Sequence, residues 1–149
     1  MSLKPHEFEF MKAADLARLA TVQPDGTLQN NPVGFIYNDD LGTIDIHRYR
    51  MSKSSKFRNV ASNSTVALVI DDIASRNPWR VRCLEIRGTA EQVESDGRRI
   101  EPNDPDGSEI DTAVIRITPR RIISLGIDDT RTEPHKLVAD SRDVPTTAD

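Results

Sequence analysis

The sequence predicts a mainly β protein, an antiparallel barrel with small helices packed outside it. Most of the regular patterning falls into short strand-like runs, and only two segments show helical periodicity. Hairpin turns such as Pro24-Asp25-Gly26 and residues 38–42 separate the first strands. Proline fixes one dihedral angle of such a turn, and glycine accepts the positive one. Short strands joined by tight turns favour a closed antiparallel barrel.

The first half of the chain is expected to hold one helix and three strands. Residues 7–19 carry apolar side chains at helical spacing, and residues 19–22 follow as a short strand. Residues 28–37 predict a second strand, interrupted by Pro32. Because proline has no N–H to donate, this strand should lie at a sheet edge or contain a bulge. Residues 43–47 alternate between apolar and polar and predict a third strand.

The second half begins with a short helix over residues 55–62, with Ser54 or Ser55 as its N-cap. Phe57, Val60 and Ala61 form its apolar stripe, and Lys56 and Asn59 share another face. After it we expect a strand at 65–70 that is covered on both sides, an irregular segment at 71–79 and a strand at 80–93. An exposed loop should follow at 95–111, and then a strand pair at 113–126 that is broken near Pro119. Residues 1–128 then form one domain, and residues 129–149 a polar, mobile tail.

Composition narrows the class of protein. A chain of 149 residues with 36% hydrophobic and 30% charged residues has the size and balance of one globular domain. A net charge of -4 argues against nucleic acid or an anionic membrane as the partner. The single cysteine, Cys83, the lack of a signal-peptide pattern and the short apolar runs predict a cytoplasmic protein without a membrane span.

The segment from Ser52 to Asn59 is a candidate phosphate site. A helix N-terminus offers unsatisfied N–H groups and partial positive charge, Ser52 donates a hydroxyl, and Lys53 and Lys56 add full charges. The same composition also fits a solvated, capped helix start in a basic surface loop.

The run Gln29-Asn30-Asn31-Pro32-Val33 is a second candidate. Side-chain amides both donate and accept hydrogen bonds, so this strand could contact the polar edge of a flat heterocycle. The alternative is that Asn-Asn-Pro is only a bulge.

Three other features are weighed and set aside. Residues 103–107 look like the start of a calcium loop, but Pro102 and Ala113 stand where ligands belong. Cys83 fits a packed thiol better than a nucleophile. The three histidines are scattered, so no metal site is expected.

Several segments, in order, resemble the pyridoxamine 5′-phosphate oxidase-like split-barrel superfamily, the FMN-binding-like class of split β-barrel. They are residues 19–35 (LATVQPDGTLQNNPVGF), 42–46 (GTIDI), 56–60 (KFRNV), 66–72 (VALVIDD), 85–91 (EIRGTAE) and 115–124 (IRITPRRIIS). The run at 71–82, DDIASRNPWRVR, is similar to the F420-dependent actinobacterial branch. Together the likeness covers residues 7–128.

This resemblance implies a homodimer with a flavin-type cofactor in a groove between the subunits. It implies that Gln29, Asn30, Asn31, Pro32 and Val33 line the ring system, and that Met51, Ser52, Lys53, Lys56 and Arg58 hold the phosphate. Trp79 and Arg80 would reach the cofactor from the second subunit. The alternative for Trp79 is simple packing in the core or at an interface. Hydride chemistry would come from the cofactor, and Tyr49 and His47 are the nearest candidates for a proton donor.

The chain departs from the family pattern at His47, Arg48 and Ser55. The first two replace small residues, and the third stands where a basic residue is expected before Lys56. The leading interpretation is an F420-dependent oxidoreductase acting on a small organic substrate. The alternatives are an FMN-binding relative of pyridoxamine-phosphate oxidase and a cofactor carrier without turnover.

Overall fold

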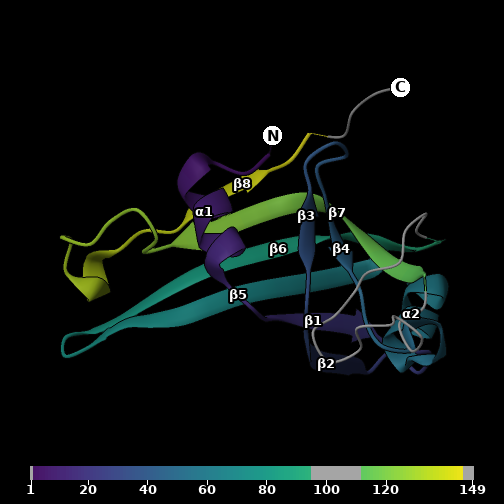
Figure 1. The fold of residues 1–149 in the computed structure, drawn as a ribbon. Helices are drawn as coiled ribbons and strands as arrows, with labels where there is room; N and C mark the ends of the chain where they lie inside the picture. Colours follow the sequence, from purple (N-terminus) through teal and green to yellow (C-terminus); the bar gives the residue numbers. More distant parts are fainter. Residues whose placement is uncertain (1, 95–111, 146–149) are drawn as a thin grey trace.

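The computed structural model describes residues 2–94 and 112–145 (Figure 1). The exposed loop expected at 95–111, with the calcium-like run inside it, lies outside the described residues. The described elements in chain order are α1 (Pro5–Ala13), β1 (Ala17–Val22), β2 (Leu28–Val33), β3 (Ile36–Asn38), β4 (Thr43–Ile46), η1 (Met51–Lys53), α2 (Ser55–Ser62), β5 (Thr65–Arg76), β6 (Trp79–Glu94), β7 (Ala113–Leu125), η2 (Pro134–Lys136) and β8 (Asp140–Asp143).

The strands form one antiparallel sheet in the order β2-β1-β5-β6-β7-β4-β3, with β8 paired to β7. The two end strands of this path, β2 and β3, are joined only by residues 34 and 35. Three residue steps span about 10 Å at most, so the sheet must curl until its ends are near each other. The mainly β, antiparallel fold is confirmed, and the strand expected at 28–37 is split between the two ends of the sheet.

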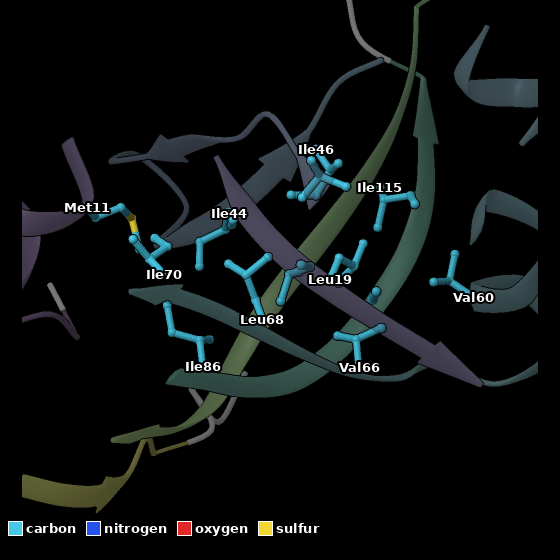
Figure 2. Close-up of a cluster of buried hydrophobic side chains, with 14 of the residues drawn as sticks. Met11, Leu19, Ile44, Ile46, Val60, Val66, Leu68, Ile70, Ile86 and Ile115 are labelled. Atoms are coloured by element: carbon cyan, nitrogen blue, oxygen red, sulfur yellow. The ribbon is translucent and has the colours of Figure 1, made fainter. Parts of the chain in front are cut away.

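The core lies inside this curl. Figure 2 shows Leu19, Ile44, Leu68 and Ile86 among the side chains that fill it, and all four are at most 1% exposed. Alternation along β6 places Leu84, Ile86 and Ala90 inward, because successive strand residues point to opposite faces. Met11 of α1 closes one end of the core. No helix of the described ranges is long and apolar enough to span a bilayer.

The expected helix over residues 7–19 is wrong at its C-terminal end. Helix α1 stops at Ala13, and Ala17 begins strand β1. Ala17 and Leu19 are buried while Arg18 is exposed, which is the period-two pattern of a strand. Pairing with both β2 and β5 overrides the helical spacing of the local sequence.

The irregular segment expected at 71–79 is also wrong. Strand β5 continues to Arg76, and β6 begins at Trp79, so the two form one long hairpin. The last pair between β6 and β7 joins Cys83 to Leu125. Residues 72–82, which we call the arm, therefore form a two-stranded ribbon. Residues 72–78 of the arm carry no apolar alternation, so their sequence gives no strand signal.

The strand pair expected at 113–126 is a single strand, β7. Pro119 does not break it, because a register shift between Arg87 and Gly88 accommodates the proline. A Cβ at Gly88 would lie 2.2 Å from the backbone oxygen of Thr118, so only glycine fits there.

The C-terminal segment, expected as a mobile tail, contributes β8 to the sheet. Arg142 on β8 makes a two-pronged ion pair with Glu7 of α1, whose side chain is fully buried. Burial raises the pKa of Glu7, but hydrogen bonds from Arg142 and the Lys4 N–H outweigh it and bring the pKa to about 2. A charge pair thus joins the two ends of the chain.

Candidate functional site

The start of α2 is a capped turn. Ser54 accepts a hydrogen bond from the Phe57 N–H at 3.3 Å, which confirms it as the N-cap, and donates one to the Met51 oxygen at 2.8 Å. Arg58 donates to the Lys53 oxygen at 2.9 Å and to Ser55 Oγ at 3.3 Å. The guanidinium of Arg58 therefore stabilises the loop before the helix.

Lys56 is buried at this helix start, with 6% of its surface exposed. Burial, and next the positive charge of Arg48, lower the pKa of its ammonium. No carboxylate of the described ranges forms an ion pair with it. A buried charge is costly unless it is paired. The arrangement is what an anionic ligand would complete.

The chain segment that contains Lys56 is basic. Residues 48–58 contain five arginines and lysines and no acidic residue, although the whole chain is acidic. Ser52 and Lys53 are exposed and can reach a ligand. Met51 is different, because its side chain is 0% exposed and lies in the core. Of the residues expected to hold the phosphate, Met51 thus has no side chain available.

Strand β2 lies at an end of the sheet path, as the proline within it predicts. Gln29 and Asn31 are half-buried and Val33 is buried, whereas Asn30 and Pro32 are exposed. The five residues expected to line a ring system are therefore divided between two faces of the strand. Gln29, Asn31 and Val33 share the inward face.

Asn59 joins the two candidate regions. Its Nδ2 donates to Thr21 Oγ1 on β1 at 3.0 Å and to Gln29 Oε1 on β2 at 2.9 Å. Lys56 and Asn59 are three residues apart on a helix, so their side chains are neighbours, and both are buried. The structure thus brings Lys56 and Gln29 to the same end of the sheet. Sequence spacing indicates the shared face of Lys56 and Asn59, but not the partners of Asn59.

Trp79 and Arg80 lie at the other end of the molecule, at the tip of the arm (Figure 1). The eleven residue steps of β5 span about 36 Å, so in one chain these residues cannot meet Lys56. Trp79 is 55% exposed. Arg80 donates to the backbone oxygens of Thr132 at 2.7 Å and Asp129 at 3.0 Å.

His47 and Tyr49 follow strand β4, close to the basic segment in the chain. His47 is half-buried, and Tyr49 is exposed with the Arg50 guanidinium 5.2 Å from its ring centroid. The assignment of His47 or Tyr49 as a proton donor stays a prediction.

Comparison with known proteins identifies the family of the chain. Residues 3–126 match the family described as pyridoxamine 5′-phosphate oxidase. A 5a,11a-dehydrotetracycline/5a,11a-dehydrooxytetracycline reductase from Streptomyces rimosus is 41% identical over 128 residues, which is 86% of each chain.

Two solved structures share the fold. An F420 reductase superposes with a TM-score of 0.55 at 26% identity, covering 74% of this chain and 90% of the other. A pyridoxamine 5′-phosphate oxidase-related, FMN-binding protein from Nostoc punctiforme gives a TM-score of 0.59 at 15% identity, covering 95% and 98%. The family match and the related reductase lead to one conclusion: this chain belongs to the pyridoxamine 5′-phosphate oxidase family and is an oxidoreductase.

Proposed function

We propose that the protein is a cytoplasmic F420-dependent oxidoreductase that transfers hydride between the deazaflavin and a small organic substrate. The observation that carries this proposal is the position of Lys56 at the start of α2, where the residue is 6% exposed and has no ion-pair partner among the described residues. The cofactor supplies the hydride chemistry when bound. The chain supplies a phosphate site and a strand that contacts the ring.

In this proposal each side chain has a defined task. Lys56 pairs with the phosphate, and the exposed Ser52 and Lys53 add hydrogen bonds from the solvent side. Gln29 and Asn31, on the inward face of β2, contact the polar edge of the ring. Arg58 holds the shape of the loop.

Sequence similarity favours F420 over FMN. The F420 reductase is 26% identical to this chain, whereas the FMN-binding structure is 15% identical. The basic segment does not separate the two cofactors, because it holds five arginines and lysines and both cofactors carry a phosphate.

The proposed site includes a second subunit. Arg80 and Arg82 attach the arm to residues 129–132 and to the Phe10 ring of its own chain, yet the arm leaves Ile73 and Trp79 exposed, at 43% and 55%. We infer a homodimer in which the arm of one subunit covers the groove of the other and Trp79 contacts the cofactor. Sedimentation of wild-type protein and of Trp79→Ser tests the interface, because a dimer that depends on the arm should weaken in the variant.

The experiment for the whole proposal is a parallel titration of apo-protein with F420 and FMN, followed by turnover with conjugated enones and quinones. Tighter binding of F420 and loss of the reduced cofactor on adding substrate support it. Tighter binding of FMN favours the FMN-dependent alternative, for which the Nostoc structure is the precedent. Tight binding without turnover of any substrate favours a carrier.

A further inference from the structure

The amide of Gln29 has only one of its two ends engaged within the described residues. Its Oε1 accepts from Asn59 Nδ2 at 2.9 Å. Asn59 is 4% exposed, and its Nδ2 also donates to Thr21 Oγ1, which is 1% exposed. Both N–H bonds of Asn59 are therefore used in a buried network, and this network holds the Gln29 carbonyl toward α2.

An amide has one acceptor end and one donor end. When Oε1 of Gln29 points toward Asn59, its NH2 group points away from the helix. Gln29 is half-buried on the inward face of an edge strand, at the same end of the sheet as Lys56. The end of Gln29 that a ligand meets is thus a hydrogen-bond donor.

We propose that Asn59 is a positioning residue that fixes Gln29 as a donor, so that Gln29 recognises a carbonyl acceptor on the heterocycle. This inference rests on the proposed cofactor site and states which edge of the ring the site selects. Flavins and deazaflavins share a pyrimidine-dione edge with two carbonyls. Asn59 and Gln29 therefore recognise the carbonyl edge that flavins and deazaflavins share. Other residues must distinguish F420 from FMN.

The orientation of the Gln29 and Asn59 side-chain amides can be measured before any ligand is added. In the apo-protein, the Asn59 NH2 should exchange slowly with solvent because both its N–H bonds are donated inside the protein. The Gln29 NH2 should exchange fast and become protected when cofactor binds. Side-chain amide exchange by ¹⁵N NMR distinguishes this from the reversed network, in which Gln29 would be slow and Asn59 fast. The reversed result overturns the inference.

A double-mutant cycle supplies the second test. Gln29→Met removes the donor, and Asn59→Leu removes its positioning partner without adding charge next to Lys56. We expect each change to weaken binding of F420 and of its phosphate-free ribityl analogue about equally, by roughly five- to tenfold. In the Gln29→Met background, Asn59→Leu should have no further effect on binding. Full additivity of the two changes would contradict a positioning role.

The controls separate folding, positioning and the phosphate site. Gln23→Met makes the same change in the turn of the same hairpin, where the Gln23 amide donates to Thr27 Oγ1 at 2.8 Å, and should leave both affinities unchanged. Thermal unfolding of each apo variant reports any structural role of Asn59. Lys56→Met should weaken only the phosphorylated ligand. If Lys56→Met has no effect, the proposed phosphate site fails, while the amide exchange rates still decide the orientation of Gln29.

Discussion

Two ends of the molecule each bury a charged residue, but only one of the two has an ion-pair partner among the described residues. At the end formed by α1 and β8, Glu7 is fully buried and receives two hydrogen bonds from Arg142. At the start of α2, Lys56 is buried to nearly the same extent and has no carboxylate partner in the described chain. The first charge is satisfied by the fold, so it serves stability. We propose that the second is completed by a bound anion and so serves binding.

The largest expected effect comes from breaking the satisfied pair. Arg142→Met leaves the Glu7 carboxylate buried without its partner, which typically costs about 3–5 kcal/mol of unfolding free energy. Urea denaturation measures this loss. Arg121→Met is the matched control on the neighbouring strand, because Arg121 pairs with the exposed Asp143 and should cost about 1 kcal/mol or less. Equal losses in the two variants would show that the Glu7 pair is not special.

The same pair predicts how stability depends on pH. The pKa of Glu7 falls from 4.5 to about 2 in the folded protein. A depressed pKa stabilises the fold above the unfolded value, and this contribution is lost as the pH falls from about 5 toward 2. It amounts to about 3 kcal/mol. Unfolding free energies measured across this range should decline less steeply for the Glu7→Gln variant, and parallel curves would refute the assignment.

Removing the charge of Lys56 should change the stability of the apo-protein in the opposite direction. Lys56→Met removes the charge of a residue that is 6% exposed and has no ion-pair partner among the described residues, so the apo-protein should become more stable by about 1 kcal/mol. Lys12→Met, at an exposed lysine of α1, should change stability by less than about 0.5 kcal/mol. A strongly destabilised Lys56 variant would mean that the ammonium is already satisfied within the fold.

The smallest expected effect is the response to inorganic phosphate. At concentrations near its dissociation constant, a ligand that binds only the folded state stabilises it by about 0.4 kcal/mol. Wild-type protein should therefore gain a small increase in melting temperature with phosphate, and Lys56→Met should gain none. An equal shift in both proteins would point to a general salt effect.

The contrast between local and long-range determinants also explains what the sequence could predict. The helix at 55–62, its Ser54 cap and the shared face of Lys56 and Asn59 depend on neighbours within four residues, and these predictions are confirmed. The end of α1 and the extension of β5 depend on pairing with distant strands, which periodicity does not encode.

The candidate site also combines features set by the local sequence with features set by long-range packing. Lys56 could be singled out because a basic helix start has a local signature. The link from Asn59 to Thr21 and Gln29 spans 38 and 30 residues, so it becomes visible only when α2 is seen packed beside β1 and β2. The alternation that divides residues 29–33 between two faces is local. Which face points inward is set by the pairing with β1.

The central claim is that Lys56 is the phosphate-binding cation of a cofactor site, and calorimetric titration of wild-type and Lys56→Met protein with F420 and its phosphate-free analogue tests it most directly. The wild type should prefer F420, and the variant should lose about 1.5–3 kcal/mol of that preference while binding the analogue as before. An unchanged F420 affinity in a folded Lys56→Met variant would contradict the claim.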